Sequence, residues 1–247
     1  MNKYALQGKL ASGGYANVYK CTNPVGTAHV CKVIPKLKLP EHRIRQEVAA
    51  MEKLHGCVYV PRLVDYFEDA DAHYIVQEYC RGISLEFKAH DEFLASLVAR
   101  ELLRGVYELH ETGVMHCDIK HGNIIFNKRD HTIKIIDFGN AQFAPSPVIT
   151  EKLMGTPLFM APEQLNHKCV YETDVWGVGI IVYHMLSGVP PFDTYKEIFS
   201  NEPTFHGFPW KEVSDEAKDF VRLCLTKEHK QRPSAETLLN HPWLASL

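Results

Sequence analysis

Two acidic motifs on either side of a short predicted hairpin constrain this sequence more than any other feature. The first is His-Cys-Asp-Ile-Lys-His-Gly-Asn at 116–123, and the second is Asp-Phe-Gly at 137–139. Apolar runs between them flank Asn-Lys-Arg-Asp, a pattern typical of a β-hairpin. Because a hairpin brings its two ends together, we expect Asp118, Asn123 and Asp137 to converge on one cleft.

Each motif taken alone has an ordinary structural explanation. An aspartate before Phe-Gly can begin a turn, and an Asp-x-Lys sequence can be a surface ion pair. The order and spacing of both motifs favour a shared site instead. Oxygen ligands on rigid β-structure suit Mg²⁺, a hard cation that prefers a few carboxylates plus phosphate oxygens. The two motifs therefore predict a site for Mg²⁺.

The first eighty residues and the remainder of the chain differ in pattern. Before residue 80, β-branched and aromatic runs alternate with Gly, Pro and Asp, as in a small antiparallel sheet; the runs lie at 18–20, 29–34 and 73–76. Apolar residues at helical spacing predict one helix between Pro40 and Gly56. From about residue 91 the pattern is mainly helical, with a buried helix over 175–186. We expect a boundary near 79–84.

Composition excludes several classes of protein. The 45% hydrophobic fraction is too high for a disordered chain, and a net charge of -3 gives no reason to expect nucleic acid or an anionic membrane as partner. Seven cysteines without a C-x-x-C pair indicate reduced thiols. The N-terminus lacks a signal-peptide pattern, and the most apolar segment is shorter than the ~18 residues of a membrane span. A cytoplasmic or nuclear location is expected.

The acidic motifs resemble those of eukaryotic protein kinases, and the resemblance extends over almost the whole chain. Residues 116–123 resemble the catalytic loop, Asp-Phe-Gly is unchanged, and Ala-Pro-Glu at 161–163 matches the end of the activation segment. The resemblance implies that Asp118 accepts the substrate hydroxyl proton and that Lys120 contacts the γ-phosphate of ATP. Asn123 and Asp137 would hold Mg²⁺.

The same resemblance implies a nucleotide site. Residues 10–18 resemble the glycine-rich loop, although two of the three family glycines are Ala11 and Ala16 here. Residues 74–80 resemble the hinge, with Gln77 as gatekeeper and backbone groups of Glu78 and Cys80 facing adenine. The implied nucleotide-binding residues are Leu10, Gly13, Gly14, Val18, Val30, Lys32, Glu47, Gln77, Glu78, Cys80 and Ile125. Val30 stands where the family usually has alanine.

Lys32 and Glu47 form the predicted phosphate-gripping pair. Glu47 lies near the apolar stripe of the predicted helix, whereas Glu41 and Glu52 project further from it. A carboxylate turned inward needs a cation, and Lys32 is the candidate partner. Without Glu47, a strand lysine would be read as a solvated side chain.

Further positions match structural residues of the family. Glu163 and Arg232 match a buried ion pair, and Asp174 matches the residue that holds the catalytic-loop backbone. His116 and Phe138 are interpreted as packing residues that align the active state. These positions are expected to support the site without taking part in the chemistry.

Several residues bear on the kind of kinase. Lys120 together with Gly-Thr-Pro at 155–157 resembles the serine/threonine type, with Thr156 in the catalytic group, and the C-terminal residues are similar to the calcium/calmodulin-dependent group. Cys117 replaces an arginine that reads activation-segment phosphate in many relatives, so activity is expected not to require phosphate at Thr150. The alternative is that Cys117 only packs and that another base, such as Lys134, takes over this role.

Substrate preference can also be compared with the family. Three positions that are acidic in arginine-directed members are Ser84, Gly122 and His184 here. A preference for arginines upstream of the acceptor is therefore not expected.

The sequence thus predicts an α+β, two-lobed protein-kinase fold in one domain over 1–247, with an N-lobe of about 1–79 and a C-lobe of about 84–247. Protein substrates with Ser or Thr acceptors, ATP and Mg²⁺ are the expected partners of a monomer. Because the chain holds little beyond the kinase unit, control is expected from the activation segment, from expression or from a regulatory protein.

Two alternative functions are compatible with parts of the pattern. One is a nucleotide-binding pseudokinase or scaffold, supported by the missing glycines and Val30. The other is a kinase of small molecules, which the peptide-docking pattern at 155–163 argues against.

Overall fold

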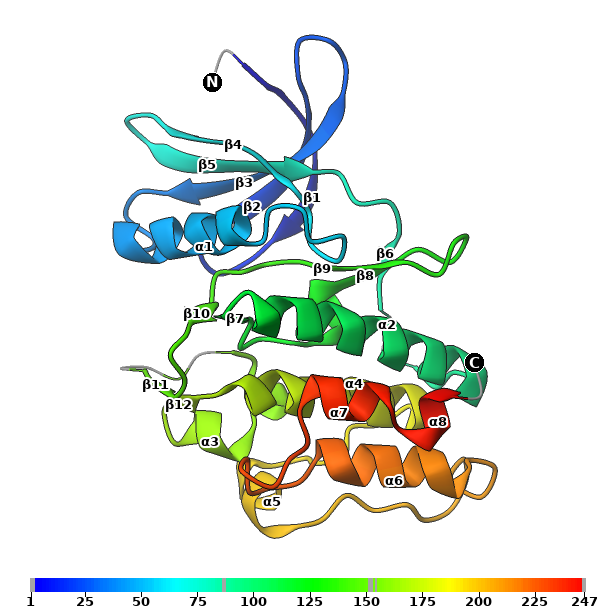
Figure 1. Cartoon of the computed structure of the whole chain (residues 1–247). Coiled ribbons are helices and arrows are strands. Elements are labelled where there is room, and N and C mark those ends of the chain that lie inside the picture. The colour runs from blue at the N-terminus through cyan, green and yellow to red at the C-terminus, as the bar shows by residue number, and fades with distance from the viewer. Residues whose placement is uncertain (1–2, 86–87, 151–152, 154, 246–247) are drawn as a thin grey trace.

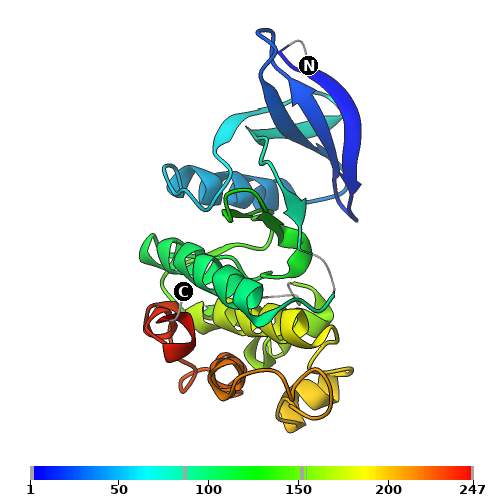
Figure 2. The same cartoon turned by 90° about the vertical axis from the view of Figure 1, so that its right-hand side faces the viewer.

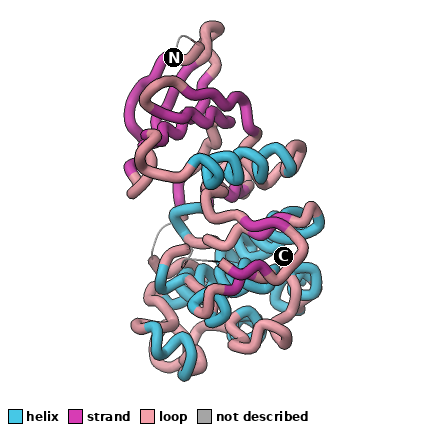
Figure 3. The backbone as a smooth tube through the Cα atoms, turned by 90° about the vertical axis from the view of Figure 1, so that its left-hand side faces the viewer, coloured by secondary structure: helices cyan, strands magenta, loops and turns pink. Residues whose placement is uncertain are grey.

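A β-sheet with one helix forms the upper lobe of the molecule, and helices form most of the lower lobe (Figures 1 and 3). The computed structural model describes residues 3–85, 88–150, 153 and 155–245. The architecture confirms the predicted α+β fold of two unlike lobes. Among the described residues, no helix is both long enough and apolar enough to cross a membrane.

The upper lobe contains a five-stranded antiparallel sheet in the order β1-β2-β3-β5-β4. The strands are β1 (Ala5–Ser12), β2 (Asn17–Thr22), β3 (Ala28–Pro35), β4 (Leu63–Glu68) and β5 (Ala72–Glu78). The three sequence runs named above fall in β2, β3 and β5. The sequence pattern did not predict strand β1, because all eight of its residues are exposed and it has no buried apolar face.

Helix α1 (Glu41–Lys53) is the one helix expected in this lobe. A view turned by 90° shows it between the sheet and the lower lobe (Figure 2). Its buried face, which includes Ile44 and Met51, packs into the main core with Ile34 and Ile75 of the sheet. The opposite side of the sheet holds a separate small cluster around Cys31. Because side chains alternate along a strand, Lys32 points to the side opposite Cys31.

The lower lobe is built around two long helices, α2 (Glu92–Glu111) and α4 (Tyr171–Ser187). All but two residues of α4 are buried, which explains its apolar pattern on every side, and Gly188 ends it in the left-handed conformation with φ 79°. The shorter helices are α3 (Pro162–Leu165), α5 (Tyr195–Ser200), α6 (Asp215–Cys224), α7 (Ala235–Leu239) and α8 (Pro242–Ala245).

Short strands and turns carry the predicted motifs. The expected hairpin is β8 (Ile124–Phe126) paired with β9 (Ile133–Ile135). Strand β7 (Val114–Met115) precedes the first motif and pairs with β10 (Gln142–Phe143), which follows the second. The other short elements are β11 (Val148–Ile149), β12 (Lys168–Cys169) and the 3-10 turns η1 (His121–Asn123) and η2 (Pro157–Phe159).

The chain passes from one lobe to the other after Glu78. Strand β6 (Ile83–Ser84) pairs with β8 and so belongs to the lower sheet. Gly82 has φ +139°, and a Cβ there would lie 2.6 Å from the carbonyl oxygen of Phe126. Only glycine allows this close approach. It lets the connection between the lobes pack directly against β8, the first strand of the hairpin.

Candidate active site

The loop between β7 and β8 gathers the polar residues of the first motif around Asp118. Lys120 Nζ donates to Asp118 Oδ2 at 2.8 Å and to Thr156 Oγ1 at 2.6 Å. Thr156 Oγ1 in turn donates to Asp118 Oδ1 at 3.1 Å, and Asn123 Nδ2 donates to Asp118 Oδ2 at 3.2 Å. The three predicted catalytic residues therefore contact one another, and both carboxylate oxygens of Asp118 accept hydrogen bonds.

Asp174, at the start of α4, holds the backbone of this loop as predicted. Its side chain is fully buried, and its two oxygens accept from the backbone N–H groups of His116 at 2.8 Å and Cys117 at 2.7 Å. Cys117 has φ 61°, a left-handed conformation that is unfavourable for a residue with a side chain. The carboxylate of Asp174 therefore stabilises a strained turn directly before Asp118.

Lys32 joins the upper lobe to the second motif. Its ammonium donates to Glu47 Oε1 at 2.7 Å and Oε2 at 2.9 Å, and to Asp137 Oδ1 at 2.7 Å. Glu47 is buried, which agrees with its place on the inner side of α1, whereas Glu41 is exposed and pairs with Arg45. The predicted partner of Glu47 is thus found, and Asp137 is a second partner.

The charges of this cluster follow from the same contacts. Burial alone would lower the pKa of Lys32, but the carboxylates of Glu47 and Asp137 outweigh it and raise that pKa. For Asp137, desolvation opposes ionisation, but the Lys32 ammonium prevails and lowers the pKa of the carboxyl to about 2. Lys32 is therefore a cation and Asp137 an anion at neutral pH.

The Asp-Phe-Gly segment is shaped to place Asp137 beside Lys32. Asp137 has φ 66°, and the side chain of Phe138 turns to the core against the edge of His116, with the two ring centroids 4.9 Å apart. A Cβ on Gly139 would lie 3.3 Å from Asp137 Oδ1 and 3.5 Å from Glu47 Oε2. Glycine at 139 leaves room for the three charged groups.

Asn123 and Asp137 were predicted to hold Mg²⁺, and their chemistry fits such an ion. The amide nitrogen of Asn123 is occupied by Asp118, so its oxygen is the group that remains for a ligand. The side chain of Asp137 is 46% exposed and ionised. An amide oxygen and a carboxylate are suitable partial ligands for Mg²⁺, which usually retains waters and binds phosphate oxygens.

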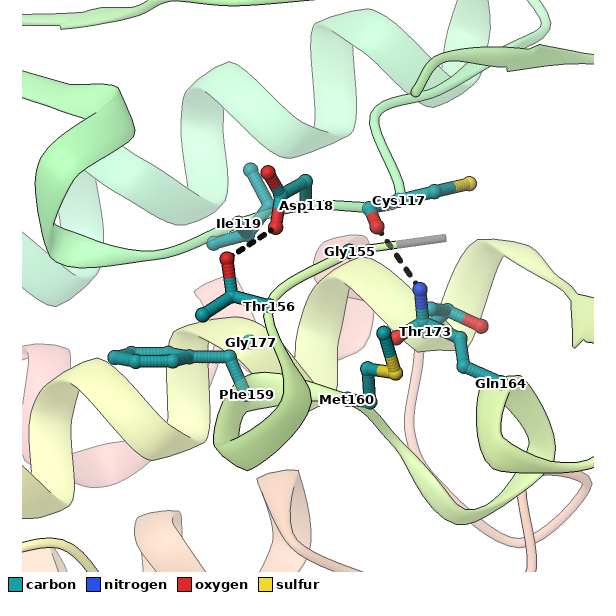
Figure 4. A pocket seen from close by; sticks show the side chains of 10 residues that line it. All are labelled: Cys117, Asp118, Ile119, Gly155, Thr156, Phe159, Met160, Gln164, Thr173 and Gly177. Atoms are coloured by element: carbon teal, nitrogen blue, oxygen red, sulfur yellow. Dashed lines mark hydrogen bonds between the residues drawn. The ribbon is translucent and has the colours of Figure 1, made fainter. Parts of the chain in front are cut away.

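The segment before α3 packs directly on the catalytic loop, as the close-up in Figure 4 shows. Gln164 Nε2 donates to the carbonyl of Cys117 at 2.9 Å, and its Oε1 accepts from the backbone N–H of Ala161 at 3.1 Å. Thr156 points from this segment toward Asp118. One glutamine thus connects the segment that carries Thr156 to the loop that carries Asp118.

Most of the predicted nucleotide residues lie on strands. Val18 is opposite Lys32, and Val30 is opposite Gln77, so these side chains share the face of the sheet that Lys32 occupies. The carbonyl of Glu78 is approached by the weakly donating thiol of Cys80 at 3.8 Å and retains capacity to accept. Leu10 is on β1, Gly13 and Gly14 are between β1 and β2, and Ile125 is on β8. Their role in binding ATP stays a prediction.

The buried ion pair between Glu163 and Arg232 is present. The guanidinium donates to the two carboxylate oxygens at 2.7 and 3.0 Å, and the side chains are 4% and 0% exposed. Arg232 also donates to the carbonyls of Glu172 and Thr226 at 2.7 and 2.9 Å. The protein therefore satisfies both charges, and the bond to Glu172 ties Arg232 to α4, the helix that carries Asp174.

The proposed substitute for the arginine missing at 117 was wrong. Lys134 donates to Glu78 Oε2 and to the carbonyl of Val60, both at 3.2 Å, which places it at the connection between the lobes and not at the activation segment. Cys117 is buried in a small apolar cluster with Met115 and Cys169.

Sequence reasoning missed some supporting contacts. His110 Nε2 lies 2.9 Å from Asp174 Oδ2, and the ring of His116 also makes polar contacts, with the carbonyl of Ile136 at 3.0 Å and the backbone N–H of Asp118 at 3.2 Å. His116 was interpreted as a packing residue only. A histidine in a helical stripe gives no signal of a partner 64 positions away.

Comparisons with known proteins agree with this geometry. Residues 4–244 match the family model described as "Protein kinase domain". Calcium-dependent protein kinase 7 of Oryza sativa subsp. japonica is 37% identical over 260 residues, which cover 98% of this chain and 48% of the relative. Calcium-dependent protein kinase 33 of Arabidopsis thaliana is 36% identical over 259 residues, covering 98% and 50%. The chain thus spans about half the length of the curated relatives it matches.

Proposed function

Because the chain belongs to the protein kinase family, we propose that it is a serine/threonine protein kinase, which transfers the γ-phosphate of ATP to hydroxyl groups of protein substrates with the help of Mg²⁺. The observation that carries the proposal is the contact of Thr156 with both Asp118 and Lys120. This contact joins residues 155–163, which resemble a peptide-docking loop, to Asp118, the residue proposed to accept the substrate proton.

The geometry supports a direct transfer. Asp118 orients the hydroxyl of the acceptor, the oxygen forms a bond to the γ-phosphorus, the bond from that phosphorus to the ADP oxygen breaks, and the hydroxyl proton passes to Asp118. Such a reaction depends mainly on positioning and charge stabilisation, so Asp118 need not be a strong base. Lys120, at 2.8 Å from Asp118, supplies positive charge where the phosphoryl group would pass.

Lys32 and the two metal-binding candidates act on the nucleotide in this proposal. The Lys32 ammonium, held by Glu47, binds the α- and β-phosphates. Bound by Asn123 and Asp137, Mg²⁺ would neutralise charge on the phosphate oxygens. The depressed pKa of Asp137 keeps this carboxylate ready for a cation throughout the neutral range.

The surroundings of the catalytic loop do not favour arginine-directed substrates. His184 lies with its ring centroid 4.9 Å from that of His121, and both side chains are buried. Burial, followed by the neighbouring histidines, lowers the pKa of His121 to about 3, so its ring is neutral. Neither Ser84 nor Gly122 supplies a carboxylate, and an acceptor peptide without upstream arginines is therefore proposed.

The geometry gives no support to the pseudokinase alternative. Lys32 is paired with Glu47, and Asp118 is in contact with Asn123. These are the arrangements that phosphoryl transfer needs, and none of the residues concerned is substituted.

The test is transfer of labelled phosphate from ATP to a generic protein in the presence of Mg²⁺. Wild type is compared with Asp118→Asn and with Asp130→Asn, a control in an exposed turn. The proposal expects transfer by wild type and by the control, and a loss of at least about 100-fold in Asp118→Asn, since acid–base groups typically contribute 10²–10⁴-fold. No transfer by wild type, or equal transfer by all three proteins, would refute it.

A further inference from the structure

Helix α1 is tied to the segment after Asp-Phe-Gly by two polar side chains that the proposed reaction does not use. Arg43 Nη2 donates to the carbonyl of Gly139 at 2.8 Å and to Asn140 Oδ1 at 3.1 Å. Gln46 Nε2 donates to the carbonyl of Ala141 at 2.6 Å. Both residues are half-buried, so these bonds are partly shielded from water.

The helical repeat places both residues next to Glu47. Residues three and four positions apart lie on the same side of a helix, so Arg43, Gln46 and Glu47 form one continuous edge of α1. Along this edge Glu47 binds Lys32, and its two neighbours bind the backbone that directly follows Asp137. A movement of α1 away from both Lys32 and residues 139–141 would therefore break all of these contacts together.

The segment that receives these bonds is itself fixed to the catalytic loop. Ala141 N–H donates to the carbonyl of Phe138 at 3.0 Å, which closes a turn over residues 138–141. The next two residues form β10, which pairs with β7, and β7 leads into His116. The contacts of Arg43 and Gln46 thus connect α1, through the turn and β10, to the strand that precedes the catalytic loop.

The contacts of Arg43 and Gln46 described above do not involve Cys117 or Lys134. Cys117 is buried in an apolar cluster, and Lys134 lies beside Glu78 at the connection between the lobes. Uncharged backbone carbonyls are the acceptors for both α1 side chains, together with the Asn140 amide. These acceptors are groups of the unmodified chain.

We propose that Arg43 and Gln46 are positioning residues, which hold α1 against residues 139–141 and so keep Glu47 paired with Lys32. The proposal rests on the proposed kinase function, because the pair matters for phosphate transfer. Neither residue touches the reacting atoms.

The test uses Arg43→Met, Gln46→Leu and the double variant, which keep apolar bulk but remove the donors. Arg45→Met is the matched control, because Arg45 is on the same helix, is 60% exposed and pairs with the exposed Glu41. The first measurement is amide hydrogen exchange in α1 and residues 137–143 at a temperature where all variants are folded. The second is kcat and the KM for the protein substrate.

The expected result is exchange about tenfold faster in both segments of the double variant, and a kcat about tenfold lower, because each net hydrogen bond shifts an equilibrium by about three- to tenfold. The KM for protein substrate is expected to stay within about twofold, since the contacts lie away from Thr156. The single variants should show smaller changes in the same direction, and the control should behave as wild type.

Wild-type exchange together with wild-type kcat in the double variant would overturn the proposal, as would equal effects in Arg45→Met. The exchange measurement also separates the two proposals. If wild type transferred no phosphate but the double variant still exchanged faster, the kinase function would fail while the anchoring of α1 would stand.

Discussion

Replacing Asp174 by asparagine tests how the catalytic loop is held. The carboxylate accepts from His116 N–H, Cys117 N–H and His110 Nε2 at 2.8, 2.7 and 2.9 Å, all in the interior. Asparagine has one oxygen for these donors and presents an NH₂ group to the others. A charge-assisted hydrogen bond is lost, and a buried N–H is left without an acceptor.

These two losses give the expected magnitude. Together they should cost about 3–5 kcal/mol of the free energy of unfolding. For a chain of this size, such a change lowers the unfolding temperature by about 10 °C. The substitution should also lower kcat in the folded protein. Cys117 has φ 61°, and once its N–H is released this strained residue can relax and displace the neighbouring Asp118. A displacement of Asp118 by about 1 Å can cost about 100-fold in kcat.

The assay combines thermal unfolding, followed by circular dichroism, with initial rates measured well below the unfolding temperature of the variant. Asp193→Asn, at an exposed position, is the control for loss of one carboxylate. An Asp174→Asn protein that unfolds within about 2 °C of wild type and keeps kcat within about twofold would refute this account of the loop.

Three further predictions concern stability and pH. Glu163→Gln leaves the buried guanidinium of Arg232 without its counter-ion and should cost about 3–5 kcal/mol in urea unfolding; a change below about 1 kcal/mol would contradict this. Desolvation opposes ionisation of Asp137, but the Lys32 ammonium lowers the pKa of this carboxyl from 3.8 to about 2. The stability due to this ionisation is therefore complete above about pH 4 and is lost as the pH falls through about 2. Asp137→Asn should thus reduce the loss of unfolding free energy at acid pH. An unchanged loss in this variant would exclude the ion pair as its source. Gly177→Ala puts a Cβ 2.7 Å from Ile119. It should destabilise the protein by about 1–3 kcal/mol in the same unfolding assay, despite the higher helix propensity of alanine. A more stable variant would show that α4 and the catalytic loop are not in tight contact.

Local patterns were sufficient to predict much of the site. The apolar runs predicted the hairpin of β8 and β9, and the Ile136 N–H, directly before Asp137, donates to the carbonyl of Asn123 at 2.8 Å. Helical spacing was enough to turn Glu47 inward and Glu41 outward, since residues of one helix face are set by the 3.6-residue repeat. The missing arginine at 117 was equally visible in the sequence.

Contacts between distant segments required the tertiary structure. No local pattern indicates that Gln164 reaches the carbonyl of Cys117, or that Gln46 reaches that of Ala141, 95 positions away. The alternative given to Lys134 failed for the same reason: its partner is decided by the packing of β9 beside the connection between the lobes. The sequence by itself determined which residues could do chemistry, because charge and helical or strand repeat belong to consecutive residues. Only the packed structure decided which backbone carbonyls and amides hold them in place, because those groups are the same in every residue and differ only in position.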